Sequence, residues 1–192
     1  MIVKQLAKEV YFDIEDAIRN RAFTGFEEDY LVLHSLLRKY RPKDVFEIGT
    51  NIGEGTNIIC NAVYKYHFEA KIYSLDLPTE LAHISLQHPI SEGKGDRVGS
   101  ACTFPYIQLR GDSMNFDYSK YPCEGFYIDG EHDYKHPFKE SSAVMDLKET
   151  KLVIWHDSDI QEVWSAIIDA IQDKPFQLYR VTDTRIAYAI RK

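Results

Sequence analysis

The sequence predicts an α/β fold, a doubly wound and mostly parallel sheet whose C-terminal strand is reversed. Five apolar runs of strand length alternate with turn signals and helical patterns, which is typical of parallel strands joined by crossover helices. These runs are residues 44–48, 71–77, 106–109, 126–128 and 152–155. Two further runs, 177–181 and 185–190, flank Thr182-Asp183-Thr184 and predict a hairpin that ends the sheet.

Helical periodicity precedes the first strand and follows the fifth. The first stripe ends at Pro42, because proline cannot continue a helix. Its members are Tyr30, Leu33, Leu36, Leu37 and Tyr40. The second stripe comprises Val163, Trp164, Ile167, Ile168 and Ile171. Since the five runs are almost wholly apolar rather than alternating, we expect helices on both faces of the sheet.

Length and charge favour a single domain that handles a small molecule. With 192 residues and 44% apolar content, the chain can bury one core. We expect a helical N-terminal segment at residues 1–40 and an α/β core at 41–192. The formal charge of −7 and the pI near 5.5 argue against nucleic acid and anionic membranes as partners. A basic leader followed by an apolar run is missing, as is any apolar segment of roughly 20 residues, so we expect a soluble, cytoplasmic protein.

The three cysteines show no pattern of a disulfide framework or a thiolate metal site. Cys60, Cys102 and Cys123 are odd in number and far apart in the chain. We expect them to be small packing residues.

A glycine loop follows the first strand, with Gly49, Gly53 and Gly55. Such a loop lets the backbone approach a ligand closely, and the next helix presents its amino end to it. The spacing is neither the dinucleotide fingerprint G-x-G-x-x-G nor the P-loop. The acidic Glu47 would repel a pyrophosphate but attract a cation, such as the amino group or sulfonium of S-adenosylmethionine.

Two more strand ends carry acids. Asp76 ends the second strand, 27 residues after Gly49, where a carboxylate accepts hydrogen bonds from both hydroxyls of a ribose. Gly111-Asp112-Ser113 ends the third, where an acid can bond an adenine amino group. Three strand ends therefore direct polar groups into one crevice, the usual ligand position in open α/β sheets. The alternative is that all are turn residues with capping carboxylates.

The order of these motifs resembles class I S-adenosylmethionine-dependent methyltransferases, and most nearly their small O-methyltransferase-type branch. Beyond the motifs above, the resemblance rests on Asp129-Gly130-Glu131-His132-Asp133-Tyr134 and on His156-Asp157, and it runs from about residue 27 to the C-terminus. It implies a Rossmann-like sheet of seven strands with the last reversed. It also implies S-adenosylmethionine bound by a set of residues at the strand ends. These are Glu47, Gly49, Thr50, Gly53, Asp76, Asp112, Ser113 and Asp129.

Asp129 and Asp157 end the fourth and fifth strands and should face each other across adjacent strand tips. Two such carboxylates repel unless a cation or proton separates them. Magnesium suits oxygen ligands, and catechol-type relatives bind a metal with acids at these positions, so Asp129 and Asp157 are candidate ligands for Mg²⁺ or another divalent metal. The neighbouring His156 suits softer metals better.

Methyl transfer to a hydroxyl also needs a base near neutral pKa. His132 lies three residues beyond Asp129 and is the first candidate, oriented by Asp133 or Asp157. His156 is the second candidate. The alternative for both histidines is a structural role, capping backbone groups or bridging loops.

We therefore predict transfer of a methyl group from S-adenosylmethionine to a hydroxyl of a small polar acceptor. A lid over the acceptor is expected from residues 11–26, with Tyr11, Phe12, Phe23 and Phe26, from residues 78–105, or from the second subunit of a homodimer. Two other classes stay open. A non-catalytic nucleoside-binding or scaffold protein would keep the fold without the reaction. An NAD-dependent oxidoreductase would use the same crevice, but its G-x-G-x-x-G fingerprint is missing.

Overall fold

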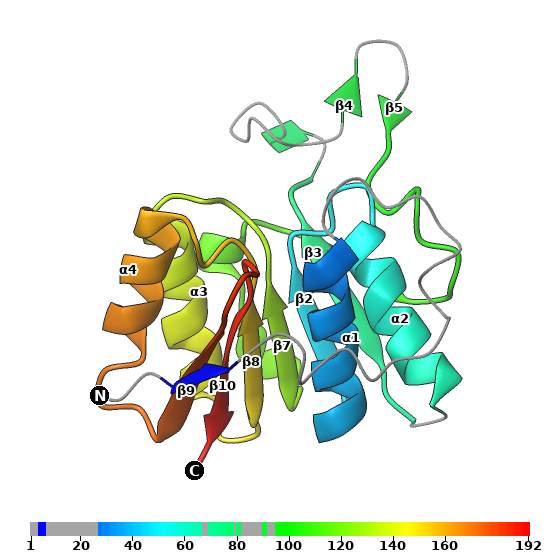
Figure 1. The fold of residues 1–192 in the computed structure, drawn as a ribbon. Coiled ribbons are helices and arrows are strands. Elements are labelled where there is room, and N and C mark those ends of the chain that lie inside the picture. Colours follow the sequence, from blue (N-terminus) through cyan, green and yellow to red (C-terminus); the bar gives the residue numbers. More distant parts are fainter. Residues whose placement is uncertain (1–3, 7–26, 67–68, 79, 82–89, 92–94) are drawn as a thin grey trace.

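A computed structural model describes residues 4–6, 27–66, 69–78, 80–81, 90–91 and 95–192 (Figure 1). Its main sheet has eight strands in the order β1-β9-β10-β8-β7-β2-β3-β6. The seven predicted strands are all present. They are β2 (Val45–Ile48), β3 (Ile72–Asp76), β6 (Ile107–Arg110), β7 (Gly125–Ile128), β8 (Leu152–Trp155), β9 (Phe176–Val181) and β10 (Ala187–Arg191). Strand β10 runs antiparallel to both β8 and β9, which confirms the reversed C-terminal strand.

The eighth strand, β1 (Lys4–Leu6), was not predicted. It pairs in parallel with β9 at the edge of the sheet. Three residues are too few to show the period of two that marks a strand in a sequence. The aromatic residues proposed for a lid at 11–26 lie outside the described residues, as does much of 78–105. Within the latter, β4 (Ile90–Ser91) and β5 (Gly95–Asp96) form a separate antiparallel pair.

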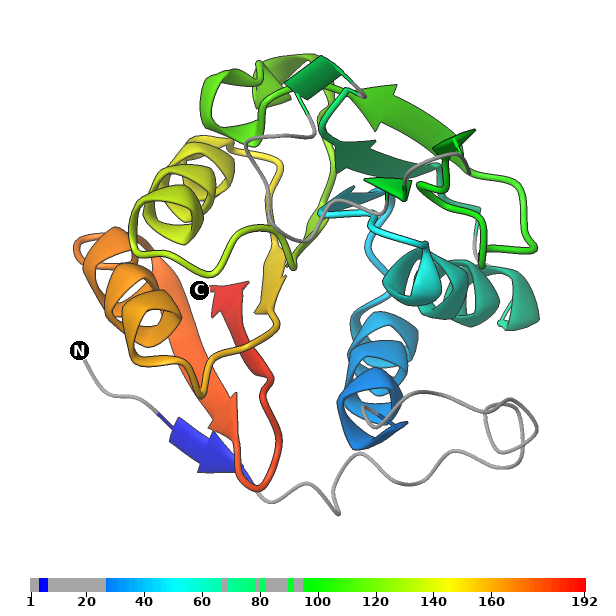
Figure 2. The same ribbon diagram turned by 90° about the horizontal axis from the view of Figure 1, so that it is seen from above.

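Helices cover both faces of the sheet, as the apolar strands predict (Figures 1 and 2). Helices α1 (Glu27–Tyr40) and α2 (Glu54–Lys65) pack together on one face, and α3 (Lys135–Asp146) and α4 (Gln161–Ala170) on the other. Every residue of β2, β7 and β8 is buried. Alternate side chains of these strands enter two apolar clusters, one beneath each helix pair.

The connection between β6 and β7 contains two short 3₁₀ helices, η3 (Ser113–Asn115) and η4 (Tyr118–Lys120), in place of a longer helix. Strands β2, β3, β6, β7 and β8 are parallel to one another, so their carboxyl ends meet at the same edge of the sheet. The predicted site residues lie near the ends of these strands, as Glu47 of β2 and Asp76 of β3 do, or in the loops that follow them. Among the described residues, no helix has the length and apolar character to cross a membrane.

Candidate functional site

The glycine loop after β2 is held by close backbone contacts. Gly49 and Gly53 have φ angles of +96° and +92°, in the region that favours glycine. A Cβ atom on Gly49 would lie 2.1 Å from the carbonyl oxygen of Asp129, and one on Gly53 would lie 2.8 Å from the Cα of Gly99. Both positions therefore require glycine. The loop lies directly against Asp129, the residue that follows β7.

Glu47 lies beneath this loop and is 1% exposed. Its carboxyl group accepts hydrogen bonds from the hydroxyls of Thr56 and Ser74. Burial raises the pKa of Glu47 to about 8, although these hydrogen bonds oppose the shift. Thr50 also points inward, with its hydroxyl 2.6 Å from that of Ser74. These side chains support the loop from the side of the sheet. The backbone of the loop is therefore the part that would contact a ligand.

The predicted ribose and adenine acids lie at the neighbouring strand ends. Asp76 accepts hydrogen bonds from the backbone N–H groups of Asn51 and Leu77, both at 2.7 Å. The first of these bonds ties Asp76 to the glycine loop. Asp112 caps η3 by accepting from the N–H of Met114 at 3.0 Å and from Nδ2 of Asn115 at 2.6 Å.

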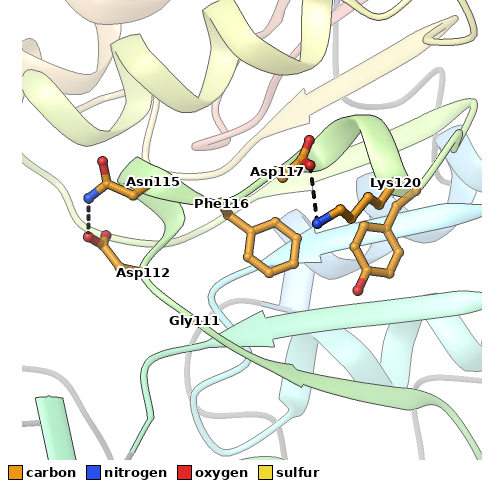
Figure 3. Close-up of a pocket in the computed structure, with 7 residues that line it drawn as sticks. Gly111, Asp112, Asn115, Phe116, Asp117 and Lys120 are labelled. Atoms are coloured by element: carbon orange, nitrogen blue, oxygen red, sulfur yellow. Dashed lines mark hydrogen bonds and ion pairs between the residues drawn. The ribbon is translucent and has the colours of Figure 1, made fainter.

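Asp112 lines a pocket of about 320 Å³ beside η3 and η4 (Figure 3). Phe116 and Tyr121 form an aromatic wall, with ring centroids 5.5 Å apart. The next residue, Ser113, instead donates its hydroxyl to the buried Glu140 of α3 at 2.6 Å. The full lining consists of Gly111, Asp112, Asn115, Phe116, Asp117, Lys120 and Tyr121.

A second group of polar residues gathers at the ends of β7 and β8, as predicted. Nδ1 of His156 lies 3.2 Å from Oδ1 of Asp129 and 3.0 Å from Oδ2 of Asp157. Nε2 of His132 lies 2.8 Å from the same Oδ2 of Asp157. The structure thus places an imidazole between the two carboxylates that were expected to repel each other. Asp157 has a φ of +51°, an uncommon value for aspartate that often marks a functional position.

The structure decides which acid orients His132. Asp133 bonds His136 instead, accepting from its backbone N–H at 2.8 Å and contacting its Nδ1 at 2.9 Å. Asp157 is therefore the partner of His132.

Two further members of this cluster were missed by sequence reasoning. Asp29 of α1 lies 3.2 Å from Nε2 of His156 through its Oδ2. Arg185, in the turn before β10, donates from Nη1 to Asp157 at 2.7 Å and from Nε to Asp29 at 3.0 Å. No local pattern marks either residue, since Asp29 and Arg185 are 156 positions apart in the chain.

The charges of the cluster shift the pKa values of its members in opposite directions. Burial alone would lower the pKa of His156, but the charge of Asp129, the close contacts with Asp129 and Asp157 and the hydrogen bond with Asp29 raise it to about 12. Burial would raise the pKa of Asp157, but hydrogen bonds from His132 and His156 hold it well below its usual range. The hydrogen bond to Asp157 raises the pKa of His132, against the effect of burial. The surrounding carboxylates therefore favour the protonated form of His156.

A divalent metal ion is the other way to separate the two acids. Asp129, His156 and Asp157 each offer a ligand atom, all within 4.8 Å of one another. This set includes a nitrogen, and His156 and Asp157 are buried, which leaves little space for the waters that magnesium retains. Arg185 also holds Asp157. The set fits a divalent ion that accepts nitrogen better than it fits Mg²⁺.

Solved structures share this fold at low sequence identity. No known protein family and no curated protein matches the chain by sequence. The O-methyltransferase NovP superimposes with a TM-score of 0.62 at 13% identity, over 86% of this chain and 78% of NovP. The methyltransferase PaMTH1 of Podospora anserina, solved with SAH, gives 0.60 at 11% identity, over 88% and 80%. An O-methyltransferase from Bacillus cereus in complex with SAH gives 0.55 at 12% identity, over 91% and 84%. The fold is that of the Rossmann-like methyltransferases.

Proposed function

We propose that this protein transfers a methyl group from S-adenosylmethionine to a hydroxyl group of a small polar acceptor. The observation that carries the proposal is the contact between Gly49 of the glycine loop and the carbonyl of Asp129, whose carboxylate belongs to the histidine–aspartate cluster. A candidate nucleoside site and a candidate proton-transfer site therefore adjoin at one sheet edge, as group transfer requires. The SAH-bound proteins of the same fold support the choice of cofactor.

The cofactor would lie across the loops that follow β2, β3 and β6. The backbone of Gly49, Thr50 and Gly53 would line it. The carboxylate of Asp76 now accepts a hydrogen bond from the Asn51 N–H. It would accept hydrogen bonds from the ribose hydroxyls either in place of that bond or in addition to it. The loop of Asp112 and Ser113 would face the adenine. Glu47 would act from beneath the loop, where its carboxyl group favours a nearby cation once ionised.

His132 is the base in this proposal. With a proton on Nε2 shared with Asp157, the neutral imidazole accepts through Nδ1. The acceptor hydroxyl gives its proton to His132 while its oxygen attacks the methyl carbon. When bound, S-adenosylmethionine would supply the methyl group: as the carbon–oxygen bond forms, the carbon–sulfur bond would break and its electron pair would stay on sulfur as S-adenosylhomocysteine.

His156 is not the base in this proposal. Its raised pKa keeps it protonated between Asp129 and Asp157, so it cannot take up a second proton. It instead neutralises the two acids and fixes their positions, together with Arg185. Asp129 is thereby held at the junction of the two sites.

Metal assistance is the alternative to this arrangement, because a metal ion binds only the unprotonated form of His156. Asp129, His156 and Asp157 would hold the ion, with manganese or zinc better suited than magnesium to the nitrogen donor. When bound there, a divalent ion would lower the pKa of the acceptor hydroxyl.

The test is a calorimetric titration with S-adenosylhomocysteine and, in parallel, with NAD. We expect binding of the first alone. Asp76→Ala should weaken it by at least about tenfold, the value of one charge-assisted hydrogen bond or more. Asp146→Ala is the matched control, because Asp146 ends α3 and pairs with Lys174, outside the proposed cofactor site. Preference for NAD, or no binding of either compound, would overturn the proposal.

A further inference from the structure

A segment outside the proposed reaction, residues 98–106, lies along α2 and against the glycine loop (Figures 1 and 2). The N–H of Gly99 donates to the carbonyl of Asn51 at 2.9 Å, and the N–H of Ala101 donates to that of Ile52 at 2.7 Å. Gly99 also packs on Gly53 closely enough to exclude a side chain there. We call residues 98–106 the strap, since they hold the outer backbone of the glycine loop.

Side chains of α2 bind the rest of the strap. Oδ1 of Asn57 accepts from both the N–H and the hydroxyl of Thr103, each at 3.2 Å. The hydroxyl of Tyr64 donates to the carbonyl of Pro105 at 2.8 Å, and its ring stacks on Phe104 with centroids 5.7 Å apart. From Asn57 to Tyr64 is about two helical turns. The strap therefore follows the helix rather than touching it at a single point.

Two thiols lie between these contacts. Cys60 of α2 and Cys102 of the strap are free cysteines that pack in the same apolar cluster. Both thiols reach the backbone of the strap: Sγ of Cys60 lies 3.9 Å from the carbonyl oxygen of Pro105, and Sγ of Cys102 lies 3.6 Å from that of Phe104. Cys60 is fully buried and Cys102 half-buried, so an oxidant in solution reaches Cys102 first. The neighbouring Cys60 lowers the pKa of the Cys102 thiol, although burial opposes this. A lowered pKa favours the thiolate, which is the form that attacks a peroxide.

We propose that Cys60 and Cys102 form a reversible disulfide that locks the strap onto α2 when the protein meets a peroxide. The Cys102 thiolate attacks a peroxide oxygen, the oxygen–oxygen bond breaks, and hydroxide leaves and is protonated to water. The Cys60 sulfur then attacks the resulting sulfenic acid. The sulfur–sulfur bond forms, the sulfur–oxygen bond breaks, and a second water leaves with the Cys60 proton. Two thiols are oxidised and one peroxide is reduced to two waters.

The disulfide ties the strap to the helix that begins at the glycine loop. It keeps the N–H groups of Gly99 and Ala101 against the carbonyls of Asn51 and Ile52, and so stabilises the present conformation of the loop. An effect on cofactor affinity follows only if the loop holds the cofactor, and that step rests on the proposed function.

The first test is peptide mapping without reduction, after treatment of the wild-type protein with hydrogen peroxide. We expect a peptide pair joined through Cys60 and Cys102, lighter by two hydrogen atoms than the free peptides and released by dithiothreitol. Cys102→Ser should abolish this pair. Cys123→Ser is the matched control and should retain it, because Cys123 lies in the apolar cluster on the opposite face of the sheet. An oxidised Cys102 without a bond to Cys60, or a disulfide between two copies of the chain, would overturn the proposal.

The second test is amide hydrogen exchange of the strap. Oxidation should slow the exchange of the Gly99 and Ala101 amides by about tenfold in the wild type, because local opening then requires the helix to move as well. The Cys102→Ser variant should show no such change. Unaltered exchange in a protein with the mapped disulfide would refute the locking of the strap. Neither test requires cofactor or methyl transfer, so its failure is distinct from failure of the proposed function.

Discussion

Replacing Arg185 by methionine should reveal how strongly the histidine–aspartate cluster depends on one guanidinium group. Arg185 bonds two of the three acids of the cluster, Asp29 and Asp157, and neutralises them together with His156. Its loss leaves these two carboxylates with one positive charge fewer. Removing one partner of a buried ion pair costs about 3–5 kcal/mol. Because the Arg185 side chain is 25% exposed, we expect the lower end, about 3 kcal/mol of unfolding free energy.

The assay is urea unfolding of the wild type and Arg185→Met between pH 7 and pH 3. In the wild type, burial opposes but hydrogen bonds from His156 and Arg185 hold the pKa of Asp29 below its usual value. A lowered carboxyl pKa gives stability that is present above the unfolded pKa near 3.9 and is lost as the pH falls through the folded pKa. The difference between the two proteins should therefore be largest at neutral pH and shrink below about pH 4.

Two control variants sharpen this experiment. Arg185→Lys keeps the charge but loses the planar fork that bonds two acids, so we expect a smaller loss of about 1–2 kcal/mol. Lys151→Ala removes an exposed pair with Glu124 and should change the unfolding free energy by less than about 1 kcal/mol. Equal stability of Arg185→Met and the wild type at pH 7, or a difference that does not change with pH, would refute the reasoning.

Three further predictions follow from the same structure. His34 of α1 is fully buried, and burial lowers its pKa to about 4. Because the unfolded chain takes up a proton at a pKa of about 6.5, the unfolding free energy should fall by about 2 kcal/mol between pH 8 and pH 5. In urea unfolding measurements, His34→Leu should lack this part of the pH dependence. His132→Ala should bind S-adenosylhomocysteine normally in calorimetry, and its rate of methyl transfer should be about 10²–10⁴-fold lower. The wild-type rate should rise with pH through a pKa above the usual value for histidine. Full activity of the variant would show that His132 is not the base. Because Arg185 and His156 already neutralise Asp157, turnover should persist in a chelator; a loss that Mn²⁺ or Zn²⁺ restores would instead assign the acids to a metal.

The sequence by itself determined seven of the eight strands of the main sheet and the edge on which the candidate site lies. Fully apolar runs such as 152–155 can be stable only where both faces of a strand are covered, which predicts the parallel sheet. Parallel strands deliver their carboxyl ends to one edge, so acids that follow separate runs, such as Asp76, Asp129 and Asp157, must share that edge. These inferences need only the local period of the chain and the direction of each strand.

Only the tertiary structure decided which groups neutralise those acids. Asp29 and Arg185 come from a helix before the first predicted strand and from the last turn, and both reach His156 or Asp157. The tertiary structure likewise placed Asp157 rather than Asp133 beside His132, and it packed Cys102 in the same apolar cluster as Cys60. A periodic pattern records which face of an element is buried, but not which distant side chain meets it. Contacts between side chains that are distant in the sequence depend on how the helices and loops pack on the sheet, and no short-range pattern encodes that packing.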